Sequence, residues 1–419
     1  MRISTNEFLL GSLNDLLAQQ QNVNQLDREI STGETMLDAT SDPGGAAQVM
    51  GLANQIGQLS YDTANGQAAT QSLQTSVSAL EQVTNLLGQL QTTASSIANG
   101  TSTATERLSA VGSAQSLLQQ LVQLANTQNS NGGYIFAGSK SAGPAFTELA
   151  SGQVVFNGDA SSNQLQIGPS LSINSTISGQ GVFMNAPAGT QGVAVSASGT
   201  NIGSAYALVG GITSLSQVTA ASFAGTEYDI SFAQAGTSLT YKVTSGTGTP
   251  GSAGYNATSG VVASGAYTPG SAVAFRGIDV NMNGTPAAGD SFVVKPGSTA
   301  SLFQTVQNLV AALQMPQDTP AETTLAQQAL QNALANIGGA QTNVLSAQAT
   351  LGTSLTEIQS VQSQTSDQSA GATEQISNLQ SASMPQVLAS YSESLTALQA
   401  AELAFSKIQN LSLFNDLLP

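Results

Sequence analysis

The sequence contains no cysteine, no histidine and no tryptophan. Without cysteine the chain can form neither disulfides nor thiolate ligands, which suits a cytosolic protein or one exported without oxidative folding. Without histidine it lacks the commonest general base and any imidazole metal ligand, so Ser–His and Cys–His catalytic pairs are excluded. We therefore expect a protein that is not an enzyme and that needs no cofactor.

Charge is scarce as well, because only 8% of residues are charged, against about 25% in an average soluble domain. The 24 acidic residues outnumber the 8 basic ones, giving a formal net charge of −16. Nucleic acids and anionic membrane surfaces both attract clustered Lys and Arg, so we expect neither as a partner. No apolar run approaches the roughly 20 residues of a membrane helix. Residues 1–7 lack the pattern of a cleaved signal peptide.

Apolar side chains recur at three- and four-residue steps near both ends of the chain, which is the spacing of coiled-coil helices. A helix with one narrow apolar stripe is unstable alone, so we expect the first helix to pair with the last. The same side chains are our candidates for packing between subunits. They are Leu9, Leu13, Leu16, Val23 and Ile30 in the N-terminal seam, and Leu388, Tyr391, Leu395, Leu398, Phe405, Ile408, Leu413 and Phe414 in the C-terminal seam.

The middle of the chain, roughly 134–296, has a different texture, with short alternating runs separated by Gly, Ser and Thr. This pattern is typical of strands in a small sandwich or barrel. The low-complexity stretch 244–260 is expected to form an exposed loop. The expected strands include Gln153–Phe156, Gln164–Ile167, Tyr228–Phe232, Leu239–Val243, Val273–Ile278 and Ser291–Val294.

Together these patterns predict a mainly α protein with an inserted β domain. Its core is an elongated antiparallel coiled coil or helical bundle of N- and C-terminal helices, and the insertion is a small β-sandwich or barrel. We expect a terminal coiled-coil domain (1–42 and 385–419), a helical bundle core (43–147 and 300–384) and a β-rich outer domain (148–299).

One segment resembles a metal site, because Asp279, Asn281, Asn283 and Asp290 match much of an EF-hand calcium loop. The flanking residues read as strands, whereas an EF-hand needs helices. Position twelve is Asp, where a bidentate Glu is usual. Asn283-Gly284 between apolar alternations is also a hairpin signal. The sequence therefore favours a β-turn, with a calcium site as the weaker alternative.

Several motifs resemble known proteins. Residues 1–6 and 30–33, and the segment Thr40-Ser41-Asp42-Pro43, are similar to the N-terminal region of flagellins and hook-associated proteins. The stretch Gly133–Ser139 is similar to the exit from the helical core in hook-associated proteins of the hook–filament junction. The ending Leu411–Phe414 matches those proteins rather than flagellin. Residues 283–292 resemble a β module inserted in several members.

This resemblance implies a structural subunit of the bacterial flagellum, an adaptor at the hook–filament junction. It implies homo-oligomeric assembly outside the cell, with a hook-side junction protein, flagellin and an export chaperone as partners, after type III export without a cleaved signal peptide. It also implies that Ile3–Ile30 and Leu388–Leu417 become ordered only when neighbouring subunits bury their seams. Two alternatives stay open: a flagellin-like filament subunit, and a surface adhesin that uses the β insert.

Overall fold

A computed structural model of the chain describes residues 2–35, 42–98, 102–218, 226–247, 256–296 and 299–416. The chain divides into two compact units, Met1–Ala64 with Val361–Pro419, and Asn65–Ser360. We call them the terminal unit and the central unit. Two long helices contribute residues to both, α2 (Pro43–Ile97) and α6 (Pro320–Gln380).

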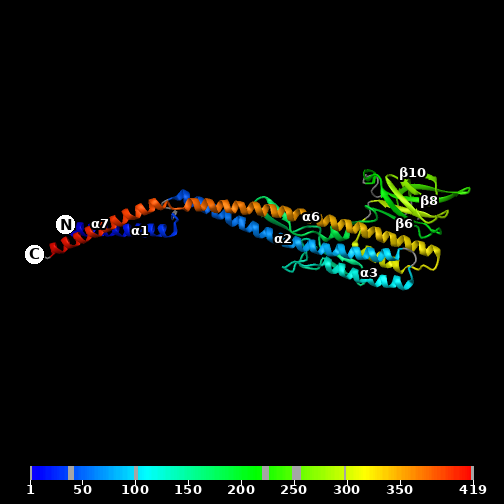
Figure 1. The fold of residues 1–419 in the computed structure, drawn as a ribbon, viewed down its shortest axis with the longest axis horizontal. Coiled ribbons are helices and arrows are strands. Elements are labelled where there is room, and N and C mark those ends of the chain that lie inside the picture. The colour runs from blue at the N-terminus through cyan, green and yellow to red at the C-terminus, as the bar shows by residue number, and fades with distance from the viewer. Residues whose placement is uncertain are drawn as a thin grey trace. The chain divides into compact units, whose positions relative to one another are not determined.

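In the terminal unit the first helix pairs with the last. Helix α1 (Arg2–Thr32) contacts α7 (Met384–Asp416), and the two lie alongside each other in Figure 1. Gln19 donates from Nε2 to the carbonyl oxygen of Ser394 at 3.3 Å. The pairing is antiparallel, because Gln19 contacts Ser394, whereas Glu34, which follows α1, bridges to Ser381, which precedes α7. The expected pairing of the two terminal helices is therefore confirmed.

A short backbone bridge joins the segment that follows α1 to the segment that precedes α7. Glu34 and Ser381 form an antiparallel β-bridge. Thr35 N–H donates to the Gln380 carbonyl at 2.6 Å, and Ala382 N–H donates to the Gly33 carbonyl at 3.0 Å. Gly33 ends α1 with φ +73°, a left-handed conformation that favours glycine. The end of α1 and the break between α6 and α7 are thus fastened to each other.

The helices of the central unit bury continuous heptad stripes. Buried positions on α2 follow each other at alternating steps of four and three residues, as in a coiled-coil seam. This stripe includes Ser76, Val83 and Leu90, because in a 3.5-residue repeat every turn of the helix contributes one buried position. Helix α6 carries a matching stripe. The buried residues are Ala69, Leu73, Ser76, Leu80, Val83, Leu87, Leu90, Ala94 and Ile97 on α2, and Ala326, Leu330, Ala333, Ile337, Ala340, Val344, Leu351 and Ile358 on α6.

Two shorter helices complete this helical core. Helix α3 (Ala104–Ala125) packs against α5 (Leu302–Gln314). Thr103 and Glu106 form a capping box that satisfies the first backbone donors of α3. Gln327 at the start of α6 donates to the carbonyl of Ala98 at the end of α2. Helix α5 ends at Gln314, just before Met315 and Pro316.

The β insert of the central unit is a sandwich of two antiparallel sheets that share one buried core. The sheets follow the orders β10-β9-β8-β13-β6 and β11-β12-β7. Figure 1 shows β6, β8 and β10 in this part of the chain. The strands are β6 (Val193–Ala197), β7 (Tyr206–Ile212), β8 (Glu227–Ala235), β9 (Ser238–Thr247), β10 (Asn256–Ala266), β11 (Ala272–Phe275), β12 (Ile278–Asn283) and β13 (Ser291–Pro296).

Smaller elements lie between the helices and the sandwich. Antiparallel pairs are formed by β1 with β2, β3 with β4, and β5 with β14. A mainly helical fold with an inserted β region is therefore confirmed. The bounds are β1 (Phe146–Glu148), β2 (Val154–Phe156), β3 (Gln164–Gly168), β4 (Leu171–Asn174), π-helix η1 (Gln180–Met184), β5 (Ala186–Pro187), α4 (Leu215–Val218) and β14 (Thr299–Ala300).

Three local expectations were wrong. The expected strand Val273–Ile278 is two strands, because Arg276 and Gly277 adopt φ +48° and +78° and turn the chain from β11 into β12. The stretch 244–260 is strand at both ends, in β9 and β10, while 248–255 lies outside the described residues. Asn283-Gly284 does not close a hairpin, because β12 and β13 belong to different sheets.

The motif at 134–139 is a buried junction in the chain. Ile135, Phe136 and Ala137 are fully buried. Asp159 accepts hydrogen bonds from the hydroxyl and the backbone N–H of Ser139, and these bonds hold the pKa of Asp159 below its usual value. Gly138 has φ +70°, and a Cβ there would overlap the Asp159 carboxylate and carbonyl. The motif therefore requires glycine at position 138, both for its φ angle and because a Cβ has no space there.

We expect Gly138→Ala to destabilise the central unit by more than about 2 kcal/mol, since it adds left-handed strain to a steric overlap. Thermal or urea unfolding of the full chain measures this change. Gly132→Ala is the matched control, because Gly132 also has a positive φ, +77°, but has open space around it. Equal losses in the two variants would contradict the overlap argument.

Candidate assembly surface

Helix α1 has an apolar stripe that the described part of the chain leaves largely exposed. Leu10, Leu13 and Leu17 are 57%, 40% and 47% exposed, and their spacing of three and four residues puts them on one face. Val23, which is buried, and Leu16, which is half-buried, lie on the neighbouring side of α1, roughly 100° around the helix axis. Helix α1 is thus apolar on two faces, of which pairing with α7 uses one.

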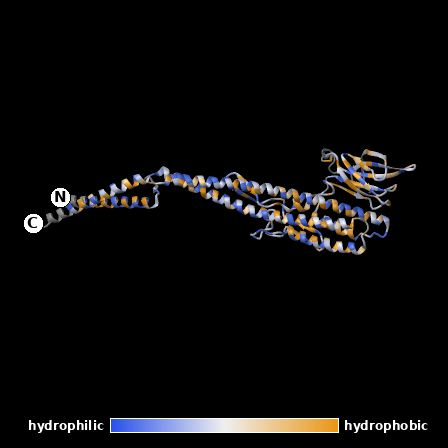
Figure 2. Cartoon of the chain, in the orientation of Figure 1, coloured by the Kyte–Doolittle hydropathy of each residue, from blue (hydrophilic) through white to orange (hydrophobic). Residues whose placement is uncertain are grey.

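Helix α7 is built in the same way. Leu388 and Leu403 are 50% and 66% exposed, and Met384 is 36% exposed. Other apolar side chains of α7, among them Leu395 and Leu398, are half-buried. Figure 2 shows hydrophobic residues recurring along both α1 and α7. Leucines left exposed on paired helices are typical of a surface that another chain buries.

The structure separates the predicted seam residues into groups. Of the seam side chains that the structure describes, Val23 alone is buried, and Leu13 and Leu388 face outward. The side chains of Leu9, Ile408, Leu413 and Phe414 lie outside the described residues. Which seam residues pack between subunits, and where the domain boundaries lie, stay predictions. The half-buried group is Leu16, Ile30, Tyr391, Leu395, Leu398 and Phe405.

Sequence reasoning missed Leu10, Leu17 and Leu403. The doublets Leu9-Leu10 and Leu16-Leu17 held the signal for two of them, because adjacent residues on a helix are about 100° apart. One narrow stripe cannot hold both members of such a pair. The doublets therefore indicate a second apolar face.

The residues of the calcium alternative lie on and after a strand. Asp279, Asn281 and Asn283 belong to β12, and Asn281 is exposed. Asp290 is buried, and its carboxylate accepts from the backbone N–H groups of Ile202 (2.8 Å), Ala287 (2.8 Å) and Gly203 (3.1 Å). These hydrogen bonds occupy the carboxylate oxygens of Asp290 and hold the loop in place, which favours the turn over the calcium site. Among the described residues, no three acidic side chains group as metal ligands would.

The surroundings of the Asp229 side chain disfavour its ionised form. It lies on β8, between Thr244 of β9 and Val293 of β13. Its Oδ1 is buried, and within the described part of the chain it has no hydrogen-bond partner. Burial raises the pKa of Asp229 to about 6. At neutral pH the insert therefore holds an ionised group that folding disfavours.

This pKa shift predicts a pH dependence. The folded state binds a proton more tightly than the unfolded state, so stability should fall as pH rises from about 4 to about 6 and stay reduced above that. Asp229→Asn should remove this fall and make the insert more stable than wild type at pH 7. Urea unfolding of both proteins between pH 4 and pH 7 measures it, and parallel pH profiles would contradict the assignment.

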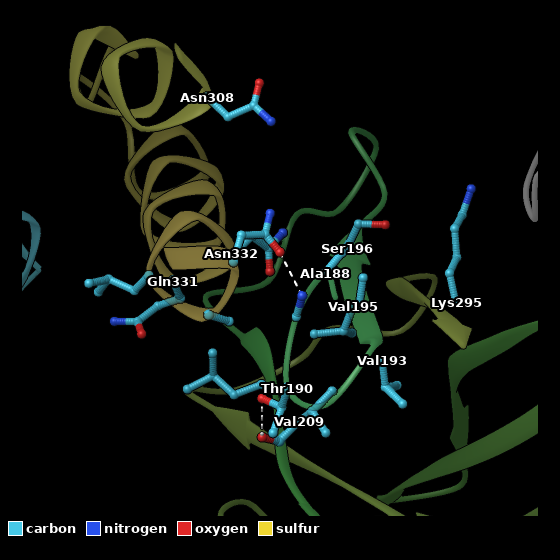
Figure 3. A pocket seen from close by; sticks show the side chains of 16 residues that line it. Ala188, Thr190, Val193, Val195, Ser196, Val209, Lys295, Asn308, Gln331 and Asn332 are labelled. Atoms are coloured by element: carbon cyan, nitrogen blue, oxygen red, sulfur yellow. Dashed lines mark hydrogen bonds between the residues drawn. The ribbon is translucent and has the colours of Figure 1, made fainter. Parts of the chain in front are cut away.

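A cavity of about 430 Å³ lies where the sandwich meets α5 and α6 (Figure 3). Its walls are mostly small apolar and amide side chains, among them Val195, Val209, Asn308 and Asn332. Lys295 also lines the cavity, and its ammonium is paired with Glu227 at 2.7 Å. In the described part of the chain, no helix is long and apolar enough to cross a membrane.

Comparison with known proteins first defines the class. Residues 3–141 match the bacterial flagellin N-terminal helical region. This segment spans α1, α2 and α3, and so includes one of the two helices of the candidate surface, while α7 lies outside it.

The particular relatives follow. The chain is 26% identical over 418 residues to flagellar hook-associated protein 3 of Escherichia coli (strain K12), covering 99% of each chain. Flagellar hook-associated protein 3 of Legionella pneumophila has a crystal structure that matches with a TM-score of 0.69 and 29% identity, over 78% of this chain and 98% of that one. A crystal structure of the flagellar junction protein FlgL from Legionella pneumophila matches with a TM-score of 0.68 and 28% identity, over 79% of this chain and 100% of that one. The chain is thus a homologue of flagellar hook-associated protein 3 over nearly its full length, and the resemblance seen in the sequence is confirmed.

Proposed function

We propose that this chain is a structural subunit of the bacterial flagellum that joins hook to filament. The observation that carries the proposal is the nearly full-length homology to flagellar hook-associated protein 3. It acts outside the cell, as a component of the flagellum, and it is not an enzyme. The flagellin-like alternative is less well supported, because the relatives that match along the whole chain are junction proteins.

The mechanism is burial of helix faces between copies. Pairing α1 with α7 leaves leucines on the outer faces of both helices. Burying one leucine side chain contributes about 1.5–3 kcal/mol, so a ring of copies gains this energy at every contact. Low charge helps, since few like charges oppose close packing of copies. We infer that neighbouring subunits complete the pair that a single chain leaves half-covered.

Specific partners belong to the same proposal. The hook-side junction protein would lie below this subunit and flagellin above it. An export chaperone would hold the C-terminal seam before assembly, because an exposed apolar helix is prone to aggregation. Each of these contacts would use the outer faces of α1 and α7.

Deleting the gene and restoring it tests the proposal. Without the subunit, cells should carry hooks without filaments and should secrete unassembled flagellin. Restoring the chain with an epitope tag in the β insert should return filaments, with label confined to the hook–filament boundary in immunoelectron microscopy. Label along the whole filament would show a filament subunit instead. Normal filaments in the deletion strain would overturn the proposal.

A further inference from the structure

Strand β7 is an edge strand whose free side is closed by a helix. In its sheet β7 is paired with β12 only. An open edge exposes backbone N–H and C=O groups that must find partners or pair with another chain. Here side chains of α6 provide hydrogen-bond partners for backbone groups of β7.

Gln328 of α6 takes the place of a neighbouring strand. Its Oε1 accepts from the backbone N–H of Ala207 at 2.6 Å, and its Nε2 donates to the carbonyl of the same residue at 2.8 Å. Nε2 also donates to Oδ1 of Asn332 at 2.9 Å. The side-chain amide therefore meets one strand residue as a peptide group would. Gln328 is only 3% exposed, and a buried amide is tolerated only when it is hydrogen-bonded in this way.

The contact continues along the same face of α6. Asn336, eight residues after Gln328, accepts from the N–H of Gly189 at 2.6 Å. Gly339 has no room for a Cβ, because the carbonyl oxygen of Pro187 lies against it. Asn343 then donates to the carbonyls of Gly181 and Val182 at 2.8 and 2.9 Å.

A side chain from the insert itself hydrogen-bonds to the next residue on the free side of β7. Thr190 donates its hydroxyl to the carbonyl of Val209 at 3.4 Å (Figure 3). On the free side of β7, both backbone groups of Ala207 and the carbonyl of Val209 thus have partners without any added strand. These two closures come from different elements, since Gln328 lies on α6 and Thr190 in the loop before β6.

We propose that Gln328 is a positioning residue that acts as a side-chain strand: it closes the edge of β7 and fixes the β insert in one orientation on α6. Asn336 and Asn343 fasten the adjoining segments 181–189 to the same helix. The insert is then a rigid part of the central unit, not a tethered appendage. In an assembly of many copies, this closure also removes an edge at which strands of neighbouring copies could pair.

The first test measures orientation. Because the chain has no cysteine, spin labels can be placed by Ile202→Cys in the insert and Leu345→Cys on α6, both exposed positions. In the otherwise wild-type chain we expect one narrow distance distribution. Gln328→Ala should broaden it, and backbone amide exchange at Ala207 should accelerate at least tenfold. Gln331→Ala is the matched control, because it removes a glutamine side chain three residues further along α6 that also lines the cavity.

The second test separates the amide pairing from ordinary packing. Gln328→Glu keeps the size of the side chain, but its ionised form cannot donate to the Ala207 carbonyl. At pH 7 the carboxylate faces the carbonyl oxygen of Ala207 and Oδ1 of Asn332 without a proton to donate, so the distance distribution should broaden as in Gln328→Ala. At pH 4.5 the protonated acid can donate again and should restore the narrow distribution. This test is specific because it depends on one donor and needs no large change in volume. A narrow distribution in Gln328→Glu at both pH values would overturn the proposal, as would an unchanged distribution in Gln328→Ala.

Discussion

Replacing Leu388 and Leu403 by glutamine should abolish incorporation of the subunit into flagella while leaving the isolated chain folded. The Leu388 side chain is 50% exposed and the Leu403 side chain is 66% exposed. Changes at such positions alter stability by no more than about 0.5 kcal/mol. Burial between copies would contribute about 1.5–3 kcal/mol per leucine, so losing two leucines at every contact weakens each contact by several powers of ten.

Complementation of a deletion strain measures this effect, with swimming motility and the amount of subunit in sheared flagella as readouts. Ile202→Gln is the matched control, because Ile202 is 75% exposed but belongs to the β insert. We expect that variant to swim normally. If the double variant assembled at wild-type level, the outer face of α7 would not be an assembly surface. Thermal unfolding of the purified variant verifies that its loss of function is not a loss of fold.

Truncating Phe183 should cost more stability than any surface change in the molecule. Phe183 is fully buried. Its ring centroid lies 5.1 Å from that of Phe136, 5.4 Å from Phe146 and 5.9 Å from Phe303. These rings join the 134–139 motif, strand β1, the π-helix η1 and helix α5. Phe183→Ala removes a whole ring from this cluster and should destabilise the central unit by about 3–5 kcal/mol.

Phe183→Leu should recover a large part of that loss, because it refills most of the cavity. Tyr61→Ala removes a ring that is 72% exposed and should have almost no effect. Differential scanning calorimetry of the full chain distinguishes the three variants. A loss in Phe183→Ala no larger than in Tyr61→Ala would show that the aromatic cluster does not hold the central unit together.

Helical parts of the fold followed from the sequence because their cause is local. A 3.5-residue repeat of apolar side chains specifies a helix and an apolar face, whatever the partner is. Asp42-Pro43 likewise marks the start of α2, where Asp42 Oδ1 accepts from the N–H of Gly45 at 2.9 Å. Both signals lie within a few residues, so they can be read without knowing the rest of the chain.

Strand pairing was less predictable, because turn signals in the sequence do not say which strands they join. Asn283-Gly284 and Arg276-Gly277 both turn the chain with a positive φ at glycine. Only the second closes a hairpin, while the first carries the chain from one sheet to the other. The difference lies in the strand order, because β12 is flanked by β11 and β7 and has no side left for β13, and that order is a property of the assembled sandwich.

The paired termini illustrate the same division. By itself the sequence determined that both ends form helices with apolar seams, and that chemistry based on cysteine or histidine is impossible. Only the tertiary structure decided which leucines α1 and α7 use on each other and which they leave outward, and that the buried amide of Gln328 serves as a strand partner. The physical reason is that periodicity defines a face, whereas burial depends on what the rest of the chain places against that face.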